Sequence, residues 1–350
     1  MAGRSGVIAG MTILGSFGRQ ETLTHTPKGE IAKSIGSSFF RGENCNFNPY
    51  LKDHHSPDFL ERFLLRGWMP DEPSIDRDTR ITAFGSCFAE NITNHLRGIG
   101  YTTSKDRAPD IYLSSMGEGL VNVHSLLGQL EWALEGVEPP DGLWHGYKAE
   151  QYGATETVRT RTRSALLDTQ FFIITLGLSE VWYDEQTGGV FWRAVPVEHY
   201  DPGRHRFRVC SMAETKAALL RIHELVRRHV PDAKLLFTLS PVPLAATFRP
   251  VGCISANSAS KAILRAALDE MLREAGPCLN RDLFYWPSYE IITDLFFSRY
   301  EQDGRHPHRP IIQFIMRLFE AVHCRSGTSL REMTELYQQT RKANAELALR

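Results

Sequence analysis

The chain has 350 residues, enough to bury one large core or two smaller ones, and its 42% hydrophobic and 23% charged residues are ordinary for a globular protein. Lys and Arg (40) nearly balance Asp and Glu (41), so no net field favours nucleic acid or an anionic membrane as a partner. The six cysteines are scattered without a C-x-x-C pair, which indicates neither a disulfide framework nor a zinc site and favours a reducing compartment, the cytoplasm.

The first 78 residues are polar and show little periodicity, so we expect an irregular arm over the core. Residues 5–18 are uncharged, but polar and glycine residues interrupt them and no convincing cleavage site follows, so we interpret them as a flexible or strand-like leader. A short helix is predicted over 56–68, with Ser56 as its cap and Pro57 in its first turn. No apolar run reaches the roughly 18–20 residues that span a bilayer.

Residues 81–91 predict a strand, a sharp turn and a helix. The apolar residues 81–84 suit a buried strand, Gly85 can take backbone dihedrals closed to other residues, and apolar residues at helical spacing follow. Ser86 and Cys87 then fall in the first turn of the helix, where unpaired N–H groups favour a thiolate and a developing oxyanion. That is the geometry a nucleophile needs, although the same junction also occurs where small residues serve only as caps.

Strands alternate with helices through the rest of the chain. We expect strands at 110–113, 171–176, 235–239 and 282–286, the first of them weak. Helices are expected at 119–135, 211–230, 257–271, 291–300 and 311–323, with Asn257 or Ser258 as the cap of the third. Such alternation implies a parallel sheet with helices on both faces, a three-layer α/β/α fold whose site lies beyond the carboxyl ends of the strands.

Three further segments depart from this alternation. The polar residues 137–165 are predicted to form an insertion, and residues 181–183 and 190–192 are predicted to pair as a β-hairpin. From Ser329 we expect a charged helix that docks on the core or on another subunit. These patterns divide the chain into an N-terminal arm (1–78), an α/β domain (79–325) and a helical tail (326–350).

The loop 301–309 contains a second informative stretch. Asp303 precedes His306 by three residues, a spacing at which a carboxylate can hold one imidazole nitrogen and leave the other free as a base. Taken alone, the same residues also fit a solvated polar turn. His308 is a second candidate base, but no acid stands three residues before it.

Five motifs together resemble the GSCFA domain family over about residues 45–325. They are FGSCFA (84–89), TLGLSEVW (175–182), LSPVPL (239–244), NSASK (257–261) and WPSYE (286–290). The family is similar to the SGNH/GDSL hydrolases. That resemblance implies a flavodoxin-like parallel sheet and a nucleophile–His–Asp triad whose last two members share one D-x-x-H block, here Asp303 and His306.

The resemblance leaves two candidates for the nucleophile. The Gly-Asp-Ser block of those hydrolases, laid without a gap on residues 85–87, places the nucleophile on Cys87, whereas a one-residue shift places it on Ser86. The ungapped register keeps strand and helix in phase and favours Cys87.

The resemblance also suggests where an oxyanion and substrate are held. The hydrolases carry Gly-x-Asn where this chain has Gly177 and Ser179, so the Ser179 hydroxyl stands in for the missing amide. Gly117 or Gly119 is expected to supply a backbone donor. Two further motif residues, Glu180 and Asn257, complete the predicted oxyanion and substrate-binding set.

These features imply acyl transfer through an acyl-enzyme on Cys87, with His306 as base and Asp303 as its orienter, acting on a small-molecule or carrier-bound ester or thioester. No cofactor and no metal is expected. One alternative is an O-acetylesterase or O-acetyltransferase of carbohydrates that uses Ser86. The other is a non-catalytic binding module with the aromatic hairpin and the C-terminal helix as its partner surfaces. The oligomeric state stays open.

Overall fold

The computed structural model describes residues 13–14, 39–40, 46–115, 119–139 and 149–347. Contacts divide the chain into two compact units, Met1–Phe63 and Leu64–Arg350. The first contains a short antiparallel pair, β1 (Ile13–Leu14) and β2 (Phe39–Phe40), and a 3₁₀-helix, η2 (Leu51–His55). Apart from residues 13–14, the leader expected at 5–18 lies outside the described residues.

The helix expected over 56–68 is present only in part. The segment forms a π-helix, η3 (Leu60–Leu65), instead of an α-helix. A short apolar run does not determine which backbone hydrogen-bond spacing the chain adopts, so the sequence pattern could not distinguish the two.

The second unit is built on a four-stranded parallel sheet. Its strands are β3 (Ile81–Phe84), β4 (Phe171–Leu176), β7 (Lys234–Leu239) and β8 (Leu283–Trp286), in the order β3-β4-β7-β8. Parallel neighbours require a crossover between them, and each crossover here contains at least one helix.

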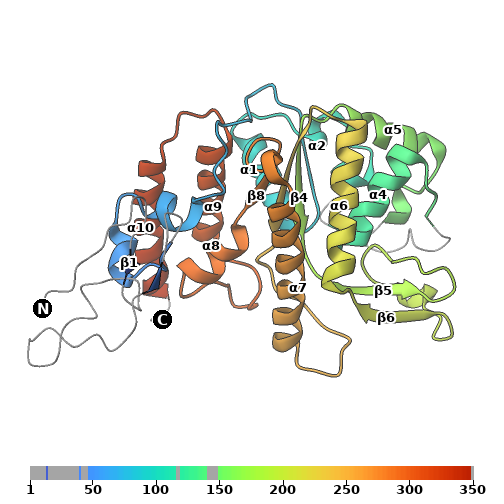
Figure 1. The fold of residues 1–350 in the computed structure, drawn as a ribbon. Coiled ribbons are helices and arrows are strands. Elements are labelled where there is room, and N and C mark those ends of the chain that lie inside the picture. Colours follow the sequence, from blue (N-terminus) through green and yellow to red (C-terminus); the bar gives the residue numbers. More distant parts are fainter. Residues whose placement is uncertain (1–12, 15–38, 41–45, 116–118, 140–148, 348–350) are drawn as a thin grey trace, which may run out of the picture. The chain divides into compact units, whose positions relative to one another are not determined.

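Helices cover both faces of this sheet (Figure 1). One layer holds α4 (Val123–Glu135), α5 (Glu156–Leu167), α6 (Met212–His229) and α7 (Cys253–Glu274). The other holds α1 (Cys87–Gly98), α8 (Ser288–Leu295) and α9 (Arg309–His323). The three-layer α/β/α fold predicted from the sequence is confirmed.

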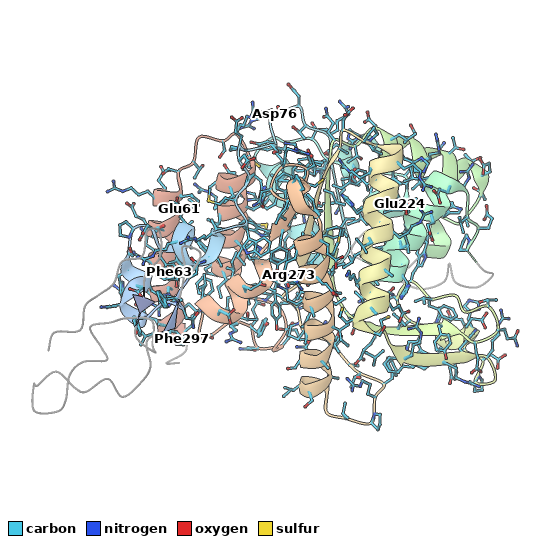
Figure 2. All side chains as sticks on the ribbon, in the orientation of Figure 1. Glu61, Phe63, Asp76, Glu224, Arg273 and Phe297 are labelled. Carbon is cyan, nitrogen blue, oxygen red and sulfur yellow. The ribbon has the colours of Figure 1, made fainter. Side chains whose placement is uncertain are left out.

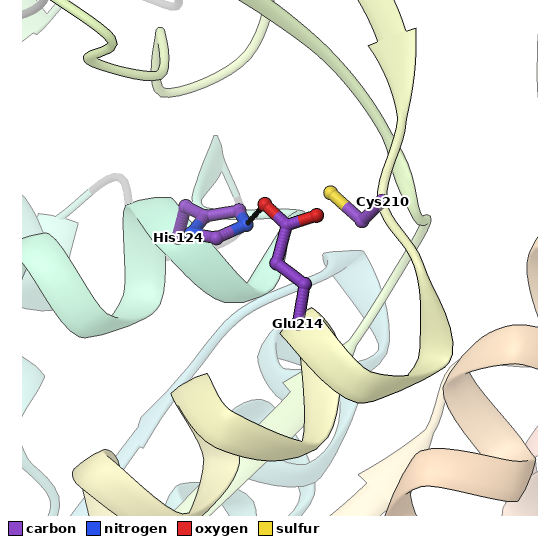
Figure 3. Close-up of side chains that lie close together, drawn as sticks. All are labelled: His124, Cys210 and Glu214. Atoms are coloured by element: carbon purple, nitrogen blue, oxygen red, sulfur yellow. Dashed lines mark ion pairs between the residues drawn. The ribbon is translucent and has the colours of Figure 1, made fainter.

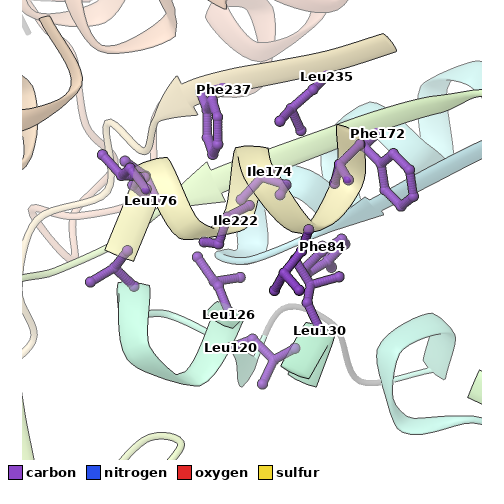
Figure 4. Packing of buried hydrophobic residues seen from close by; sticks show 14 of the residues in the cluster. Phe84, Leu120, Leu126, Leu130, Phe172, Ile174, Leu176, Ile222, Leu235 and Phe237 are labelled. Carbon is purple, nitrogen blue, oxygen red and sulfur yellow. The ribbon is translucent and has the colours of Figure 1, made fainter. Parts of the chain in front are cut away.

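Alternate strand residues serve the two layers. In β4, Phe172, Ile174 and Leu176 belong to the core shared with α4 and α6 (Figure 4), whereas the Phe171 ring lies against His323 of α9. Every β4 residue is buried, as expected for a central strand covered on both faces. Because successive side chains of a strand point to opposite faces of the sheet, β4 contributes apolar side chains to the core on each face.

Helix α6 is an amphipathic helix, as its sequence predicts. Ser211 and Glu214 form a reciprocal capping box at its start, with Ser211 Oγ accepting from the Glu214 N–H at 3.1 Å. Ile222 and Leu225 are fully buried on its inner side. Glu224 on α6, like Arg273 on α7, is exposed (Figure 2).

The expected strand at 110–113 is absent, and the prediction was wrong. Residues Tyr112–Ser115 form a helical turn, α3, which follows another short helix, α2 (Ser104–Arg107). Beyond the edge of β3, only the isolated parallel bridge from Ile81 to Thr103 extends the described sheet. The three apolar residues 111–113 are too few to distinguish a strand from a buried helical turn.

The inserted hairpin has a different partner strand from the one predicted. β5 (Glu180–Asp184) pairs antiparallel with β6 (His205–Val209). The predicted partner segment meets β5 only through the isolated bridge from Val190 to Tyr183 and backbone hydrogen bonds such as that from the Phe191 N–H to the Trp182 carbonyl, at 3.0 Å. The bidentate Arg204–Asp184 pair, at 2.8 and 2.6 Å, helps to hold β5 beside the residues that lead into β6. In β6, Phe207 and Val209 alternate with Arg206 and Arg208, a pattern typical of a half-buried strand that the sequence analysis did not use.

Two helix predictions also need correction. Residues 137–165 are not simply a polar insertion, because α5 begins at Glu156 behind the capping side chain of Thr155. Helix α7 begins at Cys253, four residues before Asn257, and Gly252 is its cap. Asn257 is typical of a cap, but its side chain is used in another contact, described below.

The tail helix α10 (Leu330–Leu347) docks on the core. Met333 and Tyr337 are buried, and the Tyr337 ring lies 5.7 Å from Phe314 of α9 and 6.0 Å from Phe296. Of the helices in the ranges described above, none has both the length and the apolar character that crossing a membrane demands.

His323 is a titratable group inside the second core. It is 0% exposed, its ring lies 4.9 Å from Phe319 and 5.6 Å from Trp286, and neither ring nitrogen has a hydrogen-bond partner in the described part of the chain. Burial, helped by the charge of Lys234, lowers the pKa of His323 to about 3. The folded protein therefore holds this imidazole neutral.

We predict that His323→Leu removes part of the acid sensitivity of folding. The unfolded chain binds this proton near pH 6.5 and the folded chain near 3, so the stability contributed by neutral His323 is complete above pH 6.5 and is lost as the pH falls toward 3. The slope is at most about 1.4 kcal/mol per pH unit. The free energy of unfolding, measured with urea at neutral and at mildly acidic pH, should differ less between the two pH values in the variant than in the wild-type protein. His199→Leu, at an exposed position, is the control, and equal pH dependence in all three proteins would contradict the prediction.

Candidate active site

A tight turn joins β3 to α1 against the neighbouring strand. Gly85 has φ +129°, and the following N–H, that of Ser86, donates to Thr175 Oγ1 at 2.6 Å and to the Thr175 carbonyl at 3.2 Å. A Cβ on Gly85 would lie 2.6 Å from Thr175 Oγ1 and closer still to its carbonyl oxygen. Only glycine fits this position, because both the positive φ and the close approach exclude a side chain.

Ser86 serves as the cap of α1. Its hydroxyl accepts from the Phe88 N–H at 3.3 Å and donates to Thr175 Oγ1 at 3.2 Å, and the residue is only 4% exposed. The Ser86 side chain is therefore directed at the helix terminus and the sheet.

Cys87 is the first residue of α1 and is half-buried. Burial raises the pKa of its thiol above the ordinary value, while Arg305, the N–H of Cys87 itself, Lys261 and Arg193 each lower the pKa by smaller amounts. The sequence predicts a more acidic thiol at a helix N-terminus, and that prediction was wrong because desolvation exceeds the favourable charges. A neutral thiol in this position needs a base.

Asp303 and His306 form the predicted carboxylate–imidazole pair. Asp303 Oδ2 contacts His306 Nδ1, and Asp303 Oδ1 accepts from the N–H groups of Arg305 and His306 at 2.9 and 3.0 Å. Those two N–H groups, and then the imidazole, hold the pKa of Asp303 well below its usual range. The carboxylate therefore stays ionised and fixes the His306 ring.

The loop that carries this pair is attached to the loop after β7. The Tyr300 hydroxyl donates to the Pro241 carbonyl at 2.9 Å, and Arg305 Nε donates to the Pro243 carbonyl at 3.2 Å. Arg305 also lies close enough to Cys87 to lower its pKa. The residue directly before His306 thus brings positive charge near the sulfur.

One face of α7 holds two of the loops at this edge of the sheet. Asn257 Oδ1 accepts from the Leu244 N–H at 3.0 Å, and Ser260 Oγ accepts from the Ser179 N–H at 2.8 Å. One turn from Asn257, Lys261 donates to the carbonyls of Gly177 and Ser240 at 2.7 and 2.8 Å. The spacing of three and four places these side chains on the same side of the helix.

The predicted oxyanion residues make structural contacts in this conformation. The N–H of Gly177 donates to the Val121 carbonyl at 2.9 Å, and the Ser179 hydroxyl donates to Ser260 Oγ at 3.2 Å. Glu180 accepts from the Thr247 hydroxyl at 2.8 and 3.0 Å. These contacts hold the loops around the site in place.

The remaining predicted positions are less informative. Gly119 is buried just before α4, and Gly117 lies outside the described residues. His308 Nε2 lies 3.5 Å from the Ser298 hydroxyl, and His308 itself precedes α9 as its cap residue. Contacts of His308 with a carboxylate do not appear in the described part of the chain.

Sequence reasoning missed Thr175 and Lys261. Thr175 opens the motif at 175–182, but as a residue of a buried strand it was given no role of its own. Lys261 did give a signal, because it stands at helical spacing from Leu264 and Leu268 on the apolar face of α7. A lysine in such a face is seldom buried without a partner, and its position could have been noted.

A second cluster of chemically active side chains lies away from this edge. His124, Cys210 and Glu214 converge (Figure 3), with their ligand atoms within 4.8 Å of one another and His124 Nε2 2.9 Å from Glu214 Oε1. These are ligand types that zinc accepts. However, Arg208 makes hydrogen bonds of 2.8 and 2.6 Å to the Glu214 carboxylate. Its guanidinium therefore already neutralises the charge of that carboxylate, and we assign this cluster no role in the chemistry of the site.

We predict that Gly85→Ala destabilises the protein by about 3 kcal/mol or prevents folding, because the new Cβ must displace β4 backbone. Gly98→Ala is a matched control at the other end of α1, where a Cβ meets no atom within 4 Å, and it should be neutral or slightly stabilising. Chemical denaturation measures both. Equal stability of the two variants would contradict the described turn.

We predict that alkylation of Cys87 by iodoacetamide keeps accelerating above pH 9 in the folded protein, because the raised pKa leaves little thiolate at neutral pH. In the guanidinium-unfolded chain the alkylation rate of the same residue should follow the pH profile of an ordinary thiol, with a midpoint at about pH 8.5. Peptide mass spectrometry of the Cys87 peptide gives both profiles. A plateau below pH 8 in the folded protein would contradict the prediction.

Comparison with known families gives one informative finding. The GSCFA family matches residues 80–319, more than two thirds of the chain, from the residue before β3 into α9. The match includes Cys87, Lys261, Asp303 and His306. No curated protein matches the chain.

Proposed function

The chain belongs to the GSCFA family, and from that premise we propose that it is an acyl-transfer enzyme that forms a thioester on Cys87. The observation that carries this proposal is the Asp303–His306 pair. The pair is held in a loop whose Arg305 lowers the pKa of the Cys87 thiol through its positive charge. A fixed carboxylate, an imidazole and a thiol at a helix N-terminus are the parts of a nucleophilic triad. The order of the three residues along the chain also matches the resemblance to SGNH hydrolases.

In the first half-reaction, His306 takes the proton of Cys87 as the sulfur attacks the acyl carbonyl. Asp303 contacts Nδ1, so Nε2 is the nitrogen that receives the proton. The sulfur–carbon bond forms, the bond to the leaving group breaks, and His306 returns its proton to the leaving group. General-base help is needed because burial keeps the thiol protonated.

In the second half-reaction, water, an alcohol or an amine attacks the thioester. His306 takes a proton from the acceptor, the carbon–sulfur bond breaks, and the proton returns to Cys87. A thioester is readily intercepted by an amine or alcohol, so transfer is favoured over hydrolysis. The N–H of Cys87, at the start of α1, is the donor best placed for the oxyanion, and such a donor contributes roughly 3–4 kcal/mol in comparable sites.

The contacts of Ser86 support its role as a cap in this proposal. The Ser86 hydroxyl already accepts a hydrogen bond from the Phe88 N–H and donates one to Thr175 Oγ1, and the residue is almost fully buried. Cys87 is more exposed, and the positive charges of Arg305 and Lys261 lower the pKa of its thiol. These contacts favour Cys87 over Ser86 as the nucleophile.

The solvent exposure of the His–Asp pair bears on the substrate. The His306 side chain is 55% exposed and that of Asp303 is 46% exposed. An open base is suited to an acyl group presented by a larger molecule, either a thioester of a carrier or an ester on a bulky acceptor. We therefore place carrier-bound acyl donors first among candidate substrates.

Intact-mass measurement after incubation with acyl thioesters of two to twelve carbons tests the proposal. We expect one acyl adduct, mapped to Cys87, that Cys87→Ala abolishes. His306→Gln should slow its formation by about 10²–10⁴-fold, because the proton acceptor is lost. Asp303→Asn should slow it less, since the imidazole remains.

Ser86→Ala is the matched control for that experiment. It removes a helix cap worth about 1 kcal/mol, so it should lower stability but retain the adduct. An adduct that maps to Ser86, or full turnover in both Cys87→Ala and His306→Gln, would disprove the proposed mechanism. Absence of any adduct with every donor would favour a non-catalytic binding module.

A further inference from the structure

Lys261 is a buried cation at the carboxyl edge of the sheet. It is 2% exposed, and its two hydrogen bonds go to backbone carbonyls, at 2.7 Å for Gly177 and 2.8 Å for Ser240. No ion pair joins it to a carboxylate in the ranges that the structure describes. Burying an ammonium group without a counter-ion is energetically unfavourable, so its position calls for a reason.

The two acceptor carbonyls stand where neighbouring strands separate. Gly177 follows the last residue of β4 and Ser240 follows the last residue of β7, and these strands pair in register at Leu176 and Leu239. The Ser240 N–H still donates to the Leu176 carbonyl at 2.8 Å. Lys261 therefore binds the first carbonyl that follows each of the two strands, and so fixes the position of both loops where they leave the sheet.

Lys261 and Cys87 are connected through the end of β4: Lys261 binds the carbonyl of Gly177, and Thr175, two residues earlier, accepts from the N–H of Ser86, the residue before Cys87. Their charges also interact. Burial lowers the pKa of Lys261 to about 7, and a negative Cys87 counteracts this effect while Arg305 adds to it. In return, Lys261 lowers the pKa of Cys87. The two other cations that lower the pKa of Cys87 are Arg305 and Arg193.

We propose that Lys261 is a positioning residue of this site, a fixed buried cation that stabilises negative charge on Cys87 while it holds the ends of β4 and β7 together. Negative charge on the sulfur favours the protonated lysine, and the protonated lysine favours that charge, so the two effects are reciprocal. In acyl transfer the same cation stabilises the thiolate released when the thioester breaks down. The role in turnover rests on the proposed function, but the effect on the thiol does not.

The alkylation rate of Cys87 in Lys261 variants tests this proposal. We expect Lys261→Met and Lys261→Gln to slow iodoacetamide alkylation of Cys87 about tenfold at pH 7, which corresponds to a rise of about one unit in the pKa of the thiol. Lys216→Met, which removes a lysine paired with Glu270 and Glu274 on the outside of α6, should leave the rate unchanged. An unchanged Cys87 rate in folded Lys261 variants would overturn the electrostatic role and leave only a structural one.

A second measurement keeps Lys261 in place, in case its variants do not fold. In a Cys45→Ser, Cys253→Ser, Cys278→Ser background, Cys87 is modified either with iodoacetate, which adds a negative charge, or with iodoacetamide, which adds none. The lysine that titrates near neutrality, followed by ¹³C NMR, should have a higher midpoint in the carboxymethylated protein. Equal midpoints would overturn the proposal. Both experiments are independent of acyl turnover, so they can succeed where the acyl-donor test fails.

Discussion

The close approach of Gly85 to Thr175 is the constraint on which the site depends. Because the turn after β3 is pressed against β4, the Ser86 N–H and hydroxyl are both satisfied by Thr175, and α1 must begin at Cys87. The thiol is thereby placed at the carboxyl edge of the sheet with the helix N-terminus behind it. Any side chain at position 85 would separate the two strands and move the sulfur.

A second set of contacts assembles the rest of the site around α7. Asn257, Ser260 and Lys261 bind the loops that follow β4 and β7, and the loop after β7 in turn binds Tyr300 and Arg305 beside the His–Asp pair. Three loops far apart in sequence are thus connected by hydrogen bonds to backbone groups. Backbone recognition fixes loop position without depending on the side chains of those loops.

The electrostatics of the site follow from burial more than from the helix dipole. The Cys87 thiol lies in a partly desolvated position that raises its pKa despite three nearby cations, and the same burial lowers the pKa of Lys261. Such opposed shifts in neighbouring groups are common where proteins perform proton transfer. In the proposed mechanism, the raised pKa of Cys87 is the reason that His306 is needed as a base.

Local sequence determined the four strands of the parallel sheet, most of the helices, the glycine turn and the Asp303–His306 spacing, because each depends on periodicity or on residues within a few positions. Tertiary structure decided what pattern does not encode: that β5 pairs with β6, that Asn257 binds a loop instead of capping α7, and that Lys261 binds the carbonyls that follow β4 and β7. Burial in the folded protein also raises the pKa of the Cys87 thiol, whereas the sequence predicted a lower pKa. Burial and pairing between distant segments set these features, and neither is a property of a local stretch of chain.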